Sequence, residues 1–167
     1  MKARFAALAF LALAGCERAT QLPSAKAAPV LDPVDFFTGH TGGRGSVDVI
    51  FKQAVPLKVE SIGVPDGNGG LVVDQRISEG DKAVHVRRWV IRPTRPGQFT
   101  GTLTDASGPV SVSVRGNTAR IAYTRNGLDV EQRLVLSDDR RTIQNRMTIR
   151  TWGIRVAHIE ERISRRR

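Results

Sequence analysis

Cysteine, aromatic residues and long apolar runs are all scarce in this chain. One of its 167 residues is cysteine, so no disulfide within the chain can stabilise the fold. Aromatic residues make up 5%, which leaves Val, Ile and Leu to build a core. The longest apolar run, residues 5–14, is too short to cross a hydrocarbon layer of about 30 Å as a helix. With 40% hydrophobic and 25% charged residues, the composition fits one globular domain.

Motifs of catalysis and of metal or cofactor binding are also missing. The chain has no nucleophile elbow, no phosphate-binding loop and no dinucleotide-binding glycine pattern. His40, His85 and His158 lie far apart, and no cysteine is placed to complete a metal site with them. Glu160 and Glu161 are adjacent, so on a strand they face opposite sides and make a poor acid–base pair. We therefore expect no enzyme, metal or cofactor.

The N-terminus has the pattern of a bacterial lipoprotein signal. Lys2 and Arg4 precede the apolar run, which ends in Leu-Ala-Gly before Cys16, as in a lipobox. The alternatives are an ordinary signal peptide with a chance cysteine, or a buried helix. We predict that residues 1–15 are removed and that Cys16 is lipidated, which anchors the chain to a membrane. Glu17 after the cysteine favours the outer membrane, with the protein facing the periplasm.

The positive charge of the chain favours different partners depending on whether the chain is anchored to a membrane. The formal net charge of +10 and the pI near 11.1 would suggest a nucleic-acid partner for a cytoplasmic protein. Loss of Lys2 and Arg4 would leave 24 of the 26 basic residues against 16 acidic ones, a net charge of about +8. In an envelope, anionic lipid headgroups are the expected contact and nucleic acid is not. Residues 165–167, all Arg, are predicted to form a solvated basic tail.

The remaining residues divide into a tether and one domain. Residues 16–30 mix Ala, Pro and polar residues without a period, and we predict a lipidated cysteine followed by a flexible tether. Asp32 before Pro33 fits a helix start and Gly39 fits its stop, so a single helical turn is expected, with Phe36 or Phe37 packed against apolar residues. Residues 31–164 form the predicted domain.

Alternation of apolar and polar residues predicts strands throughout that domain. Val110, Val112 and Val114 share one face, and a period of two cannot bury one face of a helix. Asn126-Gly127 between two alternating runs is typical of a type I′ hairpin turn. The pattern gives about eight to ten strands joined by short loops. We predict an all-β antiparallel up-and-down barrel, which leaves no open sheet edge, and keep a two-sheet sandwich as the alternative.

Four polar residues lie in the middle of otherwise apolar strand faces. Because an unpaired buried amide costs about 1–3 kcal/mol, such residues must pair with one another, hold water or face a ligand's polar end. The two interpretations left open are a hydrogen-bond network inside a filled barrel and a mostly apolar cavity for a small molecule. The four residues are Gln75, Arg88, Gln132 and Asn145.

A series of short motifs resembles a known family. In order they are Phe36-Phe37-x-Gly39, Arg88-Trp89, Gly97-x-Phe99-x-Gly101 with Asp105 and Gly108, Gly116-Asn117-x-Ala119, Asn145-Arg146-Met147 and Gly153-Ile154-x-Val156. The chain thereby resembles the bacterial envelope proteins of the domain-of-unknown-function 3833 family over residues 31–164. The resemblance implies a lipocalin-like barrel on an envelope lipoprotein, and it supplies no catalytic residues.

Three functions are compatible with these features. The first is a membrane-anchored lipoprotein whose barrel binds a lipid or another small hydrophobic ligand. The second is a structural or interaction protein, with a filled barrel that contacts the membrane or a protein partner. The third is an accessory to envelope lipid modification.

Overall fold

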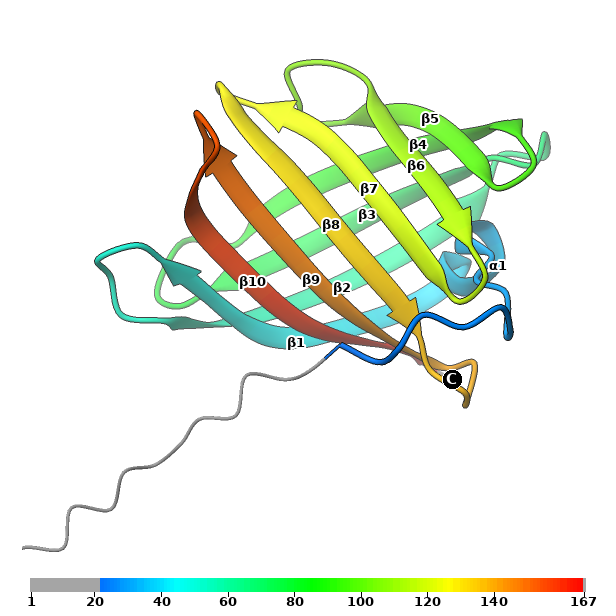
Figure 1. Ribbon diagram of the computed structural model, residues 1–167, viewed down its shortest axis with the longest axis horizontal. Helices are drawn as coiled ribbons and strands as arrows, with labels where there is room; N and C mark the ends of the chain where they lie inside the picture. Colours follow the sequence, from blue (N-terminus) through cyan, green and yellow to red (C-terminus); the bar gives the residue numbers. More distant parts are fainter. Residues whose placement is uncertain (1–21, 167) are drawn as a thin grey trace, which may run out of the picture.

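The structure is a computed structural model that describes residues 22–166; the predicted signal peptide, Cys16 and Arg167 lie outside this range. One short helix precedes ten antiparallel strands, each paired with its neighbours in the chain, and β1 also pairs with β10 (Figure 1). The elements are α1 (Pro33–Phe37), β1 (Gly39–Val49), β2 (Val55–Pro65), β3 (Leu71–Glu79), β4 (His85–Arg95), β5 (Gln98–Leu103), β6 (Val110–Arg115), β7 (Thr118–Arg125), β8 (Leu128–Leu136), β9 (Thr142–Thr151) and β10 (Ile154–Arg165). The predicted closed barrel with a helical turn is confirmed, and the sandwich is excluded.

Strand alternation places the expected residues on the inner face. Val110 and Val112 are buried, as predicted, and pack in the main core cluster. The alternation also predicts one strand face shared by Val47, Val49 and Phe51, and this is wrong for Phe51, which lies beyond the end of β1. Phe51 has a φ of 61° and is 98% exposed, because the chain turns there toward β2.

Helix α1 closes one end of the barrel. The Asp32 carboxylate accepts hydrogen bonds from the backbone N–H groups of Val34 and Asp35 and so caps the helix, as predicted. The helix then places Phe36, 2% exposed, into an apolar cluster at this end of the barrel, while Phe37 lines the interior. The expected packing of these two phenylalanines is confirmed.

Residues near both ends of the described range, 22–166, contact the barrel. Residues 24–26 cross the closed end, where the Lys26 N–H donates to Asn117 Oδ1 at 2.7 Å and Asn117 Nδ2 donates to the Ser24 carbonyl. Asn117 is 1% exposed, so residues 24–26 contact a buried side chain of the barrel; the lipidated cysteine and tether over residues 16–30 stay a prediction. Of the predicted basic tail, Arg165 ends β10 and forms an ion pair with Asp35, and the exposed Arg166 lies beside Glu60; Arg167 lies outside the described residues.

Helices in residues 22–166 are too short or too polar to cross a bilayer.

Candidate functional site

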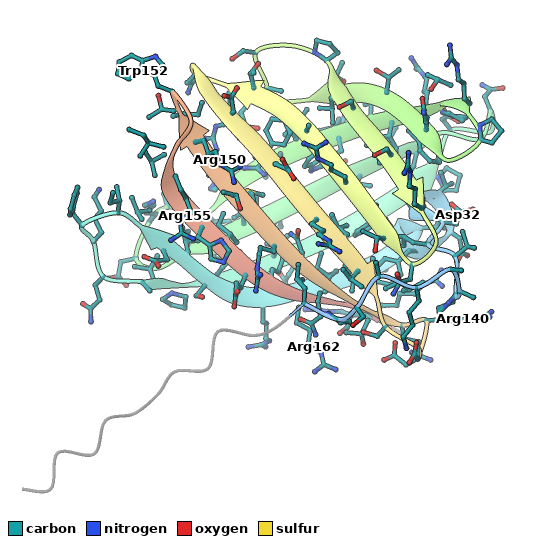
Figure 2. The ribbon with its side chains drawn as sticks, in the orientation of Figure 1. Asp32, Arg140, Arg150, Trp152, Arg155 and Arg162 are labelled. Atoms are coloured by element: carbon teal, nitrogen blue, oxygen red, sulfur yellow. The ribbon has the colours of Figure 1, made fainter. Side chains whose placement is uncertain are left out.

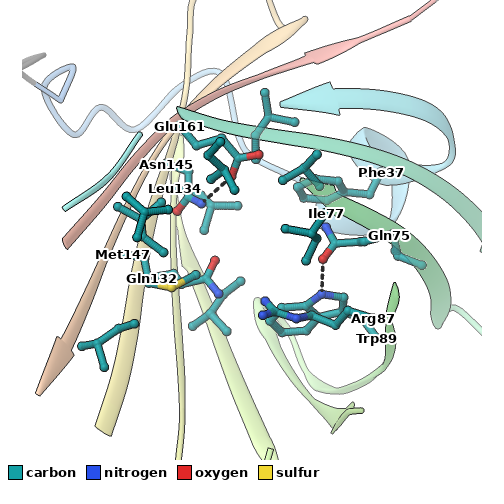
Figure 3. Close-up of a pocket in the computed structure, with 18 of the residues that line it drawn as sticks. Phe37, Gln75, Ile77, Arg87, Trp89, Gln132, Leu134, Asn145, Met147 and Glu161 are labelled. Carbon is teal, nitrogen blue, oxygen red and sulfur yellow. Dashed lines mark hydrogen bonds between the residues drawn. The ribbon is translucent and has the colours of Figure 1, made fainter. Parts of the chain in front are cut away.

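A cavity of about 350 Å³ lies inside the barrel, within the usual range for small-molecule pockets (Figure 3). Its wall comes from nearly every strand and from the α1 region. Most of the wall is aliphatic, and its residues include Val47, Leu57, Val59, Val73, Ile77, Ile91, Val112, Ile121, Leu134, Met147, Ile149 and Ile159. The barrel interior is therefore apolar and only partly filled by its own side chains.

Three of the four predicted polar residues lie on this wall. Gln75 comes from β3, Gln132 from β8 and Asn145 from β9, and Figure 3 shows Gln75 on the opposite side of the cavity from the other two. Gln132 and Asn145 are 5% and 4% exposed. The structure thus brings these three amides to one space; their role as ligand contacts stays a prediction.

Arg88 is the exception, and its predicted inward orientation is wrong. The side chain lies on the outer face of β4, 62% exposed, and Arg88 Nε donates to Asp74 Oδ1 at 2.6 Å. The hydrogen bonds from Arg88 lower the pKa of the Asp74 carboxyl, and the same contact raises that of Arg88. The prediction relied on Val86 and Val90, but Val86 is 70% exposed. Strand β4 carries apolar residues on both faces, so alternation does not identify the inner one.

Arg87, the neighbouring residue, faces the cavity instead. Its side chain is 12% exposed and its Nη2 lies 3.4 Å from Asp105 Oδ2. Arg125 Nε approaches the same carboxylate oxygen at 3.0 Å. Among residues 22–166, no hydrogen-bond partner reaches Arg87 Nε. The inner face of β4 therefore supplies a half-buried cation with one N–H group that has no protein partner in the described residues.

A chain of hydrogen bonds connects the polar residues on the Gln75 side. Trp89 Nε1 donates to Gln75 Oε1 at 2.8 Å, and Gln75 Nε2 donates to Ser61 Oγ at 3.3 Å (Figure 3). Trp89 also meets Tyr123 edge to face, with ring centroids 5.8 Å apart. Burial raises the pKa of the Tyr123 phenol, while Arg87 acts to lower it. Gln75 thus has protein partners on both ends of its amide.

Across the cavity, Asn145 and Glu161 form a buried pair. Asn145 Nδ2 donates to Glu161 Oε2 at 3.1 Å, and Glu161 is 9% exposed. Burial raises the pKa of the Glu161 carboxyl, and the hydrogen bond from Asn145 only partly offsets this. Gly43 on β1 makes room for the carboxyl group, because a Cβ there would overlap Glu161 Oε1.

The interior also contains polar atoms without a protein partner. Asn145 Oδ1 and Arg87 Nε are fully buried and make no hydrogen bond with any residue of the described part of the chain; Gln132 Nε2 is equally buried and has only the Tyr123 hydroxyl near it, without a hydrogen bond of normal geometry. Buried polar atoms of this kind are rare and call for water or a ligand. Two donors and one acceptor thus border a predominantly apolar space.

The cavity extends to the barrel end opposite α1. Glu79, Lys82, His85 and Arg125 belong to its lining, and all four lie at strand ends or in a loop on that side. We call this end the mouth, formed by the β1–β2, β3–β4, β5–β6, β7–β8 and β9–β10 connections. Nowhere in residues 22–166 do three or more His, Cys, Asp or Glu side chains gather as a metal site would require.

Comparisons with known proteins agree with this architecture. A family described as "Protein of unknown function (DUF3833)" matches residues 10–165. No curated protein matches significantly. Among solved structures, the S-type phycobiliprotein lyase CPES from Guillardia theta aligns with a TM-score of 0.64 and 10% identity over 80% of this chain and 90% of that one. The Rv2717c protein from M. tuberculosis aligns with a TM-score of 0.58 and 16% identity over 82% and 99%. At these identities the likeness concerns the fold.

Proposed function

The chain belongs to the DUF3833 family, and from that premise we propose that its barrel binds a lipid or another small hydrophobic molecule. The observation that carries the proposal is the apolar cavity of about 350 Å³ with unpartnered polar atoms on its wall. An alkyl chain in this space gains about 0.8 kcal/mol for each buried methylene, before the costs of binding. The structural neighbour described as a phycobiliprotein lyase shares the barrel fold.

The buried polar atoms support a position for the polar group of such a ligand. Gln132 Nε2 and Asn145 Oδ1 offer a donor and an acceptor on one side of the cavity, and the Glu161 carboxyl lies beside Asn145. A carboxylic acid, an amide or a hydroxyl group would satisfy both unpartnered atoms. Gln75, which already has partners at both ends, holds the wall in place in this proposal.

The size of the cavity also argues against the alternative function, a structural protein with a filled barrel. A structural barrel filled by its own side chains would leave voids no larger than a few water molecules. The space here corresponds to about ten waters at roughly 30 Å³ each, so the ligand-binding proposal accounts for it more simply.

A matched pair of substitutions on β2 tests the proposal. Val59 faces the cavity, whereas Val64 lies on the outer wall of the same strand and is 59% exposed. In titrations with a fluorescent fatty acid, we expect one molecule bound per chain. Val59→Phe should weaken binding about tenfold or more, equivalent to about 1.4 kcal/mol, and Val64→Phe should not. Absence of uptake, or equal uptake by both variants, would refute the proposal.

The membrane anchor belongs to the same proposal. We propose that Cys16, after removal of residues 1–15, carries the lipid that holds the barrel in the bacterial envelope, at the outer membrane and facing the periplasm. The lipobox pattern and the absence of a second cysteine support it. Incorporation of a labelled fatty acid into the wild-type chain, and its loss in Cys16→Ser, is the expected result. Equal labelling of the two chains would contradict it.

A further inference from the structure

Large apolar side chains are exposed at three adjacent hairpin connections of the mouth. In the barrel, β1 lies between β10 and β2, so the β9–β10, β1–β2 and β3–β4 connections are neighbours. Trp152 is 95% exposed and Phe51 98%, and Figure 2 shows Trp152 pointing away from the barrel at the tip of its hairpin. Ile154, Ile50 and Val84 are 62%, 44% and 51% exposed on the same three connections. We call these five residues the apolar rim.

The two aromatic residues of the apolar rim have an unusual backbone conformation. Phe51 and Trp152 have φ angles of 61° and 47°, in the left-handed region that favours Gly and Asn. The β7–β8 turn has the usual Asn126-Gly127 at equivalent positions, while the β9–β10 turn has Trp152-Gly153. A bulky side chain in that conformation, exposed to water, contributes little to folding. An interaction outside the barrel accounts for it better.

Positive charge accompanies the apolar rim. Lys52 follows Phe51, and Arg155 follows Ile154; both are exposed. Arg150 lies opposite Arg155 in the β9–β10 ladder, and Figure 2 shows both beside the Trp152 tip. Tryptophan at a tip, aliphatic neighbours and flanking Lys and Arg are the composition that anchors proteins at a bilayer interface. Anionic headgroups complement the three cations.

We infer that the mouth of the barrel docks on an anionic lipid bilayer, with Trp152 and Phe51 inserted at the interface. Lys52, Arg150 and Arg155 then lie at the level of the headgroups. Because the cavity extends to the mouth, this orientation sets its opening against the bilayer. The inference goes beyond the proposed function: docking requires only the apolar rim and its cations, and it holds whether or not the cavity binds a ligand.

The test follows the environment of Trp152 itself, since the predicted anchor would bring every variant to a vesicle. The full chain, as processed by the cell, is mixed with phosphatidylcholine vesicles, with and without phosphatidylglycerol. Emission of Trp152→Phe, which retains Trp89, is subtracted from that of the wild type to isolate Trp152. We expect this difference emission to shift to the blue and to be quenched by lipids brominated near the headgroup end of the acyl chain. Phosphatidylglycerol should strengthen both effects.

Substitutions distinguish docking through the apolar rim from nonspecific adsorption of the protein to vesicles. Phe51→Ser should weaken Trp152 quenching about tenfold, as expected for loss of one buried aromatic side chain. Val64→Ser removes an exposed apolar residue from the outer wall of β2 and should leave the quenching unchanged. Unshifted Trp152 emission on vesicles would overturn the inference. So would a blue shift that needs no vesicles and rises with protein concentration, which would assign the apolar rim to a second copy of the chain.

Discussion

The hydrogen bond between Trp89 and Gln75 gives a prediction that can be calculated from the structure. Trp89 Nε1 donates to Gln75 Oε1 at 2.8 Å on the cavity wall. Gln75→Leu keeps the size of the side chain but leaves the indole N–H without an acceptor, which costs about 1–3 kcal/mol. Trp89→Phe leaves the Gln75 oxygen without its donor, at a similar cost plus lost packing. The double variant removes both groups, so its destabilisation should be smaller than the sum of the two by about 1–2 kcal/mol.

Urea unfolding of the four chains measures this coupling. With a denaturant slope of about 1–3 kcal/mol/M, Gln75→Leu should lower the midpoint by about 1 M with an unchanged slope. Gln98→Leu, at an exposed position on β5, is the control and should change stability by less than about 0.5 kcal/mol. Additive effects of Gln75→Leu and Trp89→Phe would refute the assignment of Gln75 to the wall network. Gln75 would then be free to contact ligand.

Three further predictions concern other parts of the molecule. Since burial raises the pKa of Glu161 above its ordinary 4.5, wild-type stability should fall as pH rises from about that value through the raised pKa; Glu161→Gln should remove this fall, and equal pH dependence in urea melts would contradict the assignment. Trp152→Asn, which copies the Asn126 turn, should raise stability by about 1 kcal/mol in the same urea melts; a loss of stability would show that Trp152 packs on the barrel. Phe36→Ala should destabilise by about 3–5 kcal/mol in the same assay, and a change under 1 kcal/mol would mean that α1 does not close the barrel.

The barrel could be predicted from sequence because most strands alternate between apolar and polar residues and are separated by turn signals. Asn126-Gly127 gave a hairpin in the position expected, and Gln132 and Asn145 faced inward as their apolar neighbours at two-residue spacing indicated. Local pattern suffices here, because one face of the strand is buried and the other is not.

Strand β4 shows where that pattern stops being informative. Apolar residues occur on both of its faces, and the pairing of Gln75 with Arg87 settles which face is inner. Glu161 was within reach of the same reasoning, since it lies between Ile159 and Ile163 on β10. Its adjacency to Glu160 is uninformative, because neighbouring residues on a strand face opposite sides.

Other features depend on contacts between residues distant in sequence. Asn117 binds Lys26 across 91 positions, so no local period reveals that the N-terminal segment is fixed to the closed end. The volume of the cavity is likewise a sum over side chains from nearly every strand. Sequence left the choice between a filled and a hollow barrel open, and the packing in the structure favours the hollow one.

The central claim is that the barrel holds a hydrophobic ligand, and native mass spectrometry tests it most directly. The protein would be purified from its own membranes in a mild detergent and released in the gas phase without organic solvent. The proposal predicts the mass of the chain plus one non-covalent lipid-sized molecule, reduced in occupancy in Val59→Phe and undiminished in Val64→Phe. A wild-type barrel that is consistently empty, and that takes up no added fatty acid, would contradict it.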